Sequence, residues 1–154
     1  MNQNRIENAA EYFKNGFNCA QSVLAAYCEE FGLDKETALK LSCGFGGGMG
    51  RLGGTCGAVT GAYMLIGLKY ANALTSKEDN ITKEKVHSKI REFAKLFEER
   101  NKTTVCRELL GVDFIIDNNQ ATDEKKQIIN ERIKEICPQM VRDAAEIVEK
   151  LLIF

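Results

Sequence analysis

Four of the six cysteines stand where the sequence predicts the start of a helix: Cys19, Cys56, Cys106 and Cys137. Asn or Thr lies one or two residues before three of them, and Pro directly follows the fourth. Asn and Thr are preferred N-cap residues, and Pro is preferred at the first helical position. A helix N-terminus lowers the pKa of a nearby thiol, and the resulting thiolate ligates metals and attacks disulfides. We therefore expect sulfur chemistry, with Cys56 and Cys19 as the most strongly activated thiols.

The two remaining cysteines have no such position. Cys28 falls inside a predicted helix over residues 19–31. Cys43 falls at the end of a predicted helix over residues 35–43, where the helix dipole opposes a thiolate. Because free cysteine is among the most buried residue types, we expect both side chains to be buried, apolar and slow to react.

The spacing of the cysteines indicates a site assembled by tertiary packing. The chain has no Cys-x-x-Cys pair, which thioredoxin-like dithiols and zinc ribbons contain. Four converging thiols could hold an iron–sulfur cluster or another thiophilic metal, or could cycle between dithiol and disulfide. Either use predicts an oxidoreductase or electron carrier with a redox partner protein. The alternative is a non-enzymatic binding or interaction module in which a structural, zinc-like cysteine site stabilises the fold.

A glycine-rich segment over residues 44–54 lies directly before Cys56 and contains seven glycines. Residues 48–53 match G-x-G-x-x-G, but no predicted strand precedes them, so the pattern is a weak indication of nucleotide binding. Glycine costs backbone entropy, so this density favours a close-fitting loop whose N–H groups donate to sulfurs or to a ligand. A flexible linker is the other interpretation. The predicted site-loop residues are Gly46, Gly47, Gly48, Gly50, Arg51, Gly57 and Gly61.

Few other side chains are candidates for chemistry. His87 is the only histidine, and its charged helix predicts a solvated side chain. Arg51 and Arg107 each neighbour a candidate cysteine and could stabilise a thiolate, although surface or ion-pair roles fit them equally well. We expect Asp143 and Glu146 to form part of a helix surface and nothing more.

Nearly every segment of the chain has helical periodicity. The predicted helices cover about residues 6–13, 19–31, 35–43, 55–74, 82–100, 104–110, 122–136 and 138–152. Only residues 112–116 show a brief strand-like alternation. We therefore predict an all-α, single-domain irregular (orthogonal) helical bundle over residues 1–154, with the glycine-rich loop before a central apolar helix over residues 55–74.

Composition narrows the classes of partner. The 154 residues include 21 basic and 22 acidic side chains, with no basic block that would neutralise nucleic-acid phosphates. The longest apolar stretch is too short and too rich in glycine to span a bilayer, so no membrane insertion is expected. Six cysteines without an export signal favour the cytoplasm. The sequence leaves the oligomeric state open.

Five segments match an ordered set of motifs: NCAQSVL at residues 18–24, GFGGGMGR at 44–51, CGAVTGA at 56–62, CRELLG at 106–111, and CP at 137–138 followed by Val141, Ala144 and Ala145. Together they resemble the C_GCAxxG_C_C family of small bacterial and archaeal proteins, to which a redox role is ascribed. The resemblance extends over nearly the full chain and implies that Cys19, Cys56, Cys106 and Cys137 are the family's four characteristic cysteines. Thr55 stands where the family pattern has glycine.

Overall fold

The structure of the chain is a computed structural model that describes residues 2–72, 79–112 and 122–153. The described elements are α1 (Gln3–Lys14), α2 (Cys19–Tyr27), η1 (Cys28–Phe31), α3 (Lys35–Ser42), η2 (Cys43–Phe45), α4 (Gly57–Tyr70), α5 (Asn80–Asn101), α6 (Cys106–Leu110), α7 (Asp123–Val148) and the π-helix η3 (Glu149–Ile153). Over these residues the fold is all-α, as predicted, and its one β-type pairing is an isolated antiparallel bridge between Thr55 and Val105. The strand-like stretch after Val112 lies outside the described residues.

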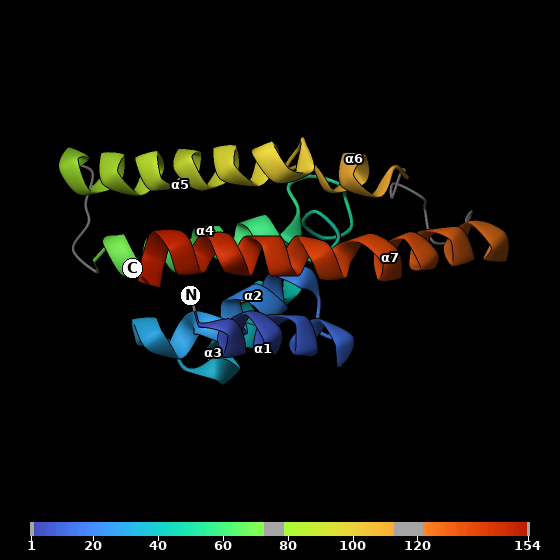
Figure 1. Ribbon diagram of the computed structural model, residues 1–154, viewed down its shortest axis with the longest axis horizontal. Helices are drawn as coiled ribbons and strands as arrows, with labels where there is room; N and C mark the ends of the chain where they lie inside the picture. Colours follow the sequence, from blue (N-terminus) through green and yellow to red (C-terminus); the bar gives the residue numbers. More distant parts are fainter. Residues whose placement is uncertain (1, 73–78, 113–121, 154) are drawn as a thin grey trace.

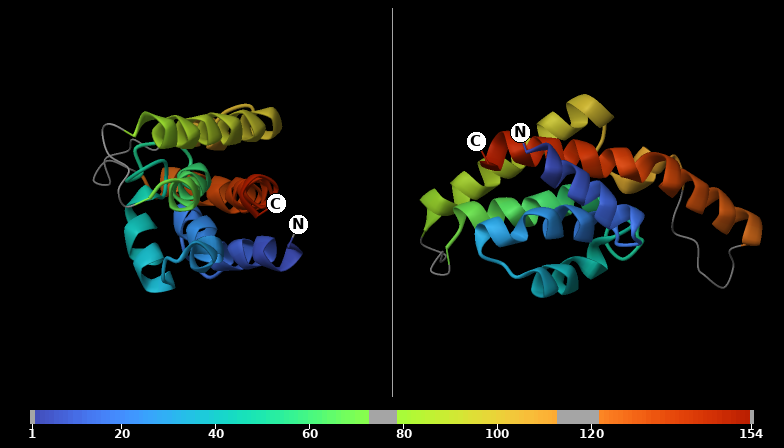
Figure 2. Two further views of the ribbon diagram at one scale, coloured as in Figure 1. Left: turned by 90° about the vertical axis from the view of Figure 1, so that its left-hand side faces the viewer. Right: turned by 60° about the horizontal axis from the view of Figure 1, so that its bottom comes forward.

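The helices form three layers (Figure 1). α4 and α7 make the middle layer, α5 and α6 cover one side of it, and α1, α2 and α3 cover the other. α1 and α5 cross α7 obliquely on its two opposite sides, so the bundle is irregular (Figure 2). The two ends of the chain meet, where the backbone N–H of Asn2 donates to Glu149 Oε2 at 2.8 Å.

Side chains of the predicted kind cap most of these helices. Asn18 and Gln21 form a capping box at the start of α2, in which each side chain accepts from the other residue's backbone N–H. Asp34 caps α3 and Thr122 caps α7, both through backbone N–H groups of the first turn. The expected caps before α4 and α6 are wrong by one residue, since Cys56 and Val105 occupy those N-cap positions.

The hydrophobic core surrounds α4, whose apolar residues lie on all sides of the helix. Leu65 and Ile66 of α4 are fully buried, as are Leu24 of α2 and Phe93 and Phe97 of α5. The predicted central helix is confirmed, although it ends at Tyr70 rather than near residue 74. Its position between α2 and α5 explains why no polar face is present.

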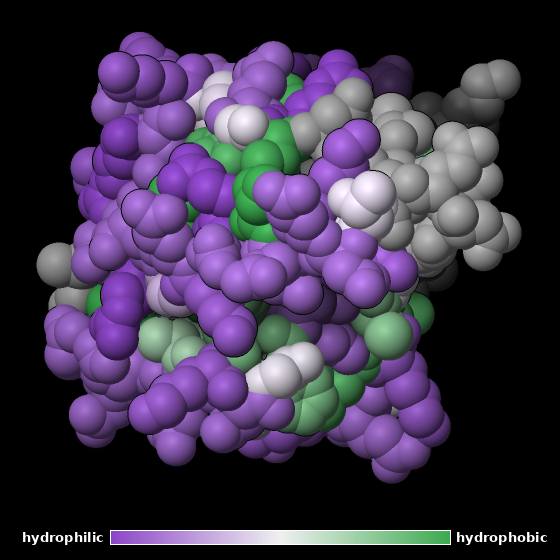
Figure 3. All heavy atoms as spheres, turned by 90° about the vertical axis from the view of Figure 1, so that its right-hand side faces the viewer, coloured by the Kyte–Doolittle hydropathy of each residue, from purple (hydrophilic) through white to green (hydrophobic). Residues whose placement is uncertain are grey.

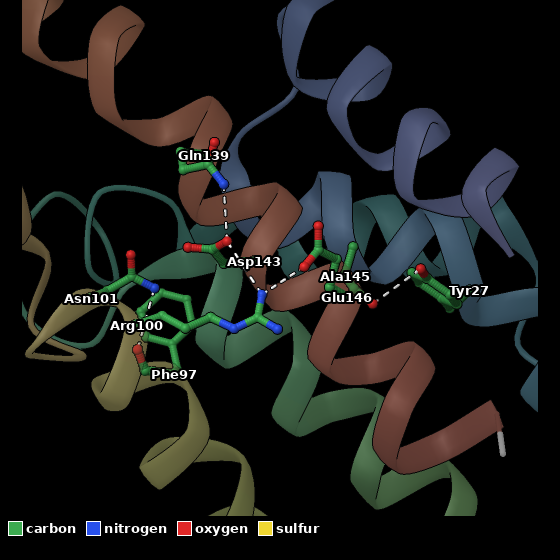
Figure 4. Close-up of polar contacts among 8 residues, drawn as sticks. All are labelled: Tyr27, Phe97, Arg100, Asn101, Gln139, Asp143, Ala145 and Glu146. Carbon is green, nitrogen blue, oxygen red and sulfur yellow. Dashed lines mark hydrogen bonds and ion pairs between the residues drawn. The ribbon is translucent and has the colours of Figure 1, made fainter. Parts of the chain in front are cut away.

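An ion-pair cluster joins α5 to α7 (Figure 4). The Arg100 guanidinium lies 2.7 Å from Glu146 and 3.4 Å from Asp143, and Gln139 donates to Asp143 at 2.9 Å. Asp143 is only 8% exposed and pairs with Arg100, so the expectation that it forms a helix face and nothing more was wrong. A buried carboxylate needs such partners, because burial removes its solvation by water.

The close approach of α2 and α4 depends on Gly61. A Cβ at this position would lie 2.8 Å from the Ala20 carbonyl oxygen and 3.3 Å from its Cα. We expect Gly61→Ala to lower the free energy of unfolding by about 1–3 kcal/mol, because the α2 backbone would have to shift. Gly67→Ala is the matched control in the same helix, since its Cβ meets nothing within 4 Å, and should be neutral or stabilising by up to about 1 kcal/mol. Urea denaturation measures both values, and equal losses would contradict this account.

Candidate functional site

The four predicted site cysteines line one cavity of about 910 Å³. Cys19, Cys56, Cys106 and Cys137 are each no more than 7% exposed, and all four are free thiols. They come from all three layers of the bundle, so no local segment could have assembled them. The structure therefore brings together the residues that the sequence selected, around one apolar space.

Cys19 is the first residue of α2, and its neighbour Asn18 fixes this end of the helix. The Asn18 side chain accepts from the backbone N–H of Gln21 at 3.0 Å and donates through Nδ2 to the Cys43 carbonyl at 2.8 Å. Gly46 of the loop lies directly against Asn18, at 2.7 Å from a notional Cβ to Asn18 Cβ. The same side chain thus starts α2 and joins it to the glycine-rich loop.

Cys56 and Cys106 are held side by side by the isolated bridge. Each follows one of the paired residues, Thr55 and Val105. The backbone N–H of Cys56 donates to the Thr104 carbonyl at 2.7 Å, and that of Cys106 donates to the Gly54 carbonyl at 2.6 Å. Main-chain hydrogen bonds therefore bring together two cysteines that are 50 positions apart in the sequence.

Gly48 shows why the loop is rich in glycine. Its φ is +71°, and a Cβ there would lie 2.5 Å from the Gly54 nitrogen and 2.8 Å from Cys106 Cβ. Gly57 likewise faces Cys19 Cβ at 3.1 Å. The loop is close-fitting, as predicted, and its glycines allow the cysteine-bearing segments to approach one another.

The expectation that the loop's N–H groups donate to sulfur is wrong for residues 49–54. Their N–H groups donate instead to carbonyls of residues 44–49, as in the bonds from Gly50 to Gly44 at 2.8 Å and from Gly54 to Gly48 at 2.9 Å. Arg51 adopts a φ of +61° and lines the cavity with an exposed side chain. The loop therefore contributes shape and a cation to the site rather than donors from these residues.

Cys137 does not start a helix. α7 continues from Asp123 through Val148 with Pro138 inside it, whereas two helices meeting at Cys137 had been predicted. Proline lacks an N–H, so the Lys134 carbonyl loses its usual helical donor at the cavity wall. Tertiary packing on both faces of α7 outweighs this local signal for a break.

The environment of Cys137 nevertheless favours its thiolate. The Cys19 thiol donates a hydrogen bond to the Cys137 sulfur, which lowers the Cys137 pKa against the opposing effect of burial. The same bond, with burial and the neighbouring sulfurs, raises the Cys19 pKa well above its ordinary value. The interaction between the two sulfurs therefore separates the pKa values of the two thiols, and that of Cys137 is the lower.

Burial decides the pKa of the other two thiols. It raises the pKa of Cys56 to about 11, although the backbone N–H groups of Ala58 and Val59 in the first turn of α4 lower it in part. Burial and the nearby sulfurs raise the pKa of Cys106 to about 12. These directions are opposite to the predicted activation of Cys56 and Cys19. At Cys56 desolvation outweighs the backbone N–H groups, and at Cys19 the interaction with the Cys137 thiol, followed by burial, raises the pKa.

The two remaining cysteines, Cys28 and Cys43, differ in their exposure to solvent. Cys28 is fully buried, as expected, and its sulfur donates to the Ala25 carbonyl at 3.7 Å. Cys43 is exposed and lines the cavity, so the prediction that this side chain is buried was wrong. It is the C-cap of α3, at the point where the chain leaves that helix for η2 and the glycine-rich loop.

The walls of the cavity include residues that the sequence did not indicate. Phe13 and Phe17 come from the end of α1 and the turn after it, and Ile133 and Met140 come from α7. Phe13 ends the predicted helix over residues 6–13, to which no role in the site was given. His87 is exposed on α5, as predicted, and Arg107 is exposed at the start of α6.

Two further properties concern metals and membranes. Within residues 2–72, 79–112 and 122–153, no group of three or more His, Cys, Asp or Glu side chains is arranged to hold a metal ion. In the same residues, none of the helices combines the length and apolar character needed to cross a bilayer.

Over its described residues the protein is therefore an all-α bundle with four buried cysteines around one cavity. Residues 17–151 match the family described as "Putative redox-active protein (C_GCAxxG_C_C)", and the chain belongs to that family. Comparisons with curated proteins and with solved structures found no match.

Proposed function

We propose that the protein is a thiol–disulfide redox protein in which Cys137 is the attacking thiolate and Cys19 the resolving thiol. The observation that carries this proposal is that Cys19 and Cys137 line the same cavity as free thiols, and that the interaction between their sulfurs lowers the pKa of Cys137 and raises that of Cys19. A thiolate beside a protonated thiol is the arrangement that thiol–disulfide exchange requires. The family's description as redox-active supports the same function.

The exchange transfers two electrons to a partner disulfide. The Cys137 thiolate attacks one sulfur of that disulfide, and the second partner sulfur leaves as a thiolate and takes up a proton from water. Cys19 then loses its proton to the remaining partner sulfur and attacks Cys137. The protein disulfide forms, the mixed disulfide breaks, and the partner is released with both sulfurs as thiols. We propose that the disulfide belongs to a redox partner protein and that the reaction takes place in a reducing compartment such as the cytoplasm.

Disulfide mapping tests this assignment. After equilibration in an oxidising glutathione buffer and alkylation of the remaining thiols, mass spectrometry should find a disulfide between Cys19 and Cys137. Cys137→Ser should remove it, whereas Cys28→Ala should leave it unchanged, because Cys28 lies outside the cavity lining. A first disulfide between Cys56 and Cys106, or none at all, would contradict the assignment.

A metal site is the second candidate. Its support is that four cysteines from four segments line one cavity, which suits the ligand set of an iron–sulfur cluster or a four-thiolate metal. Against it, the described side chains form no group arranged to hold a single ion, so we derive no chemistry through a metal. Anaerobic purification with an absorbance spectrum and iron, sulfide and zinc analysis tests it, and sub-stoichiometric metal would remove it.

A structural zinc-like site in a non-enzymatic binding module makes a different prediction from either redox candidate. Structural zinc contributes directly to folding, so chelation should then unfold the helices. A dithiol centre needs no metal, and its helical circular dichroism should be the same before and after chelation. This measurement separates the two classes of function.

A further inference from the structure

The cavity beside the cysteines has a one-sided charge distribution. Four cationic side chains line it, Lys14, Arg51, Lys134 and Arg142, and among the described residues no Asp or Glu side chain does. This contrasts with the whole chain, in which 22 acidic residues outnumber 21 basic ones. The rest of the lining is mostly apolar, so the cavity combines an apolar interior with positive charge.

Three of these cations are available to a ligand. Arg142 is paired with Glu7 through two hydrogen bonds of 2.6 and 2.8 Å. Lys14, Arg51 and Lys134 have no acidic partner within the part of the chain that the structure describes, and all three side chains are exposed. They come from α1, the glycine-rich loop and α7, so the positive charge surrounds the opening from three elements.

Size and surface chemistry also match a small ligand. The volume of about 910 Å³ lies in the range of sites that enclose small organic molecules. Phe13, Phe17, Ile133 and Met140 supply apolar walls. Figure 3 views the end of the molecule where α6 and the C-terminal end of α1 lie, and apolar residues are visible there among hydrophilic ones.

We propose that this cavity binds small organic anions that have an aliphatic body and a carboxylate group. The aliphatic chain would lie against the apolar walls beside the cysteines, and the carboxylate would face Lys14, Arg51 and Lys134. Carboxylates are the ligand charge that unpaired lysine and arginine side chains attract. Small organic anions of this kind that also carry a disulfide could be redox substrates of the protein. This role rests on the function proposed above.

Calorimetry with octanoate and octylamine tests the binding. Octanoate should bind, and octylamine, which has the same chain length and the opposite charge, should bind at least about tenfold more weakly. Lys14→Gln combined with Lys134→Gln should weaken octanoate binding about five- to tenfold, and added salt should weaken it further. Lys125→Gln is the matched control, because Lys125 lies on the same helix, α7, outside the cavity lining and should leave the affinity unchanged. Octylamine binding as tightly as octanoate, or no effect of the double variant, would overturn the proposal.

A second measurement separates this inference from the redox function. Octanoate carries no disulfide, so its binding to the wild-type protein reports on the cavity alone. Lipoate, an eight-carbon carboxylate with a disulfide, should also bind the wild-type protein, and it should release thiols with the wild type but not with Cys137→Ser. Octanoate binding without thiol release from lipoate supports the cavity and contradicts the exchange chemistry. Thiol release without octanoate binding supports the exchange chemistry and contradicts the proposed anion site.

Discussion

Replacing Cys19 with alanine is expected to raise the pH at which Cys137 becomes reactive. The Cys19 thiol donates the hydrogen bond that lowers the Cys137 pKa, while burial acts in the opposite direction. Without the donor, only burial remains, so the Cys137 pKa should move upward. Below the pKa, the thiolate fraction falls about tenfold for each unit of this increase. Alkylation of Cys137 near neutral pH, measured by peptide mass spectrometry, should therefore slow in the same proportion.

Two comparisons make this result specific. Cys28→Ala should leave the pH profile of Cys137 unchanged, because Cys28 lies outside the cavity lining and its sulfur donates to a backbone carbonyl. Cys43 should react readily in every variant because it is exposed. The pH dependence of Cys137 alkylation could instead be unchanged in Cys19→Ala, in protein with unaltered circular dichroism. That result would contradict the claim that Cys19 lowers the Cys137 pKa.

Replacing Gly48 with alanine should have the largest effect on stability. Its φ of +71° places an alanine in the left-handed region, at about 1–2 kcal/mol. The new Cβ would also lie 2.5 Å from the Gly54 nitrogen and 2.8 Å from Cys106 Cβ, and such overpacking costs about 1–3 kcal/mol. We therefore expect the free energy of unfolding to fall by about 2–5 kcal/mol in urea denaturation. Cys106 should be displaced from the cavity and become faster to alkylate.

Gly50→Ala is the matched control for this loss. Gly50 has a similar φ of +62°, but a Cβ there meets nothing within 4 Å. This variant should lose only the conformational part, about 1–2 kcal/mol, and the alkylation rate of Cys106 should stay as in the wild type. Equal losses in both variants would show that the close approach of Gly48 to Cys106 contributes nothing.

The sequence predicted those features that depend on short stretches of chain. The N-cap at Asn18, the apolar character of α4 and the close-fitting glycine-rich loop were all predictable because neighbouring residues determine them. The continuous α7 was missed because a local signal, Pro138, indicated a break that packing on both faces of the helix overrides. Local patterns are weak priors when tertiary contacts compete with them.

The thiol environments could not be predicted in the same way. The predicted activation of Cys56 was based on the helix dipole, which acts within one turn. The burial that raises the pKa of Cys56 depends instead on every element packed around this side chain. Likewise, the hydrogen bond that activates Cys137 comes from Cys19, more than a hundred residues earlier in the chain. The exposure of Cys43 follows from the shape of the loop beside it. The four cysteines of the family motifs line a shared cavity together with Cys43, but their relative acidities are a property of the assembled fold.

The positions of Cys19 and Cys137 in different layers have a consequence for the folding equilibrium. A disulfide between them would join α2 to α7 and close a loop of roughly 120 residues, which includes most of the chain. Closing so long a loop removes conformational entropy mainly from the unfolded ensemble, an effect of about 4–5 kcal/mol in the chain-entropy treatment. The oxidised protein would then unfold at a distinctly higher temperature than the reduced one. Reduction of the disulfide by a partner would lower the stability of the folded bundle and would restore the two thiols.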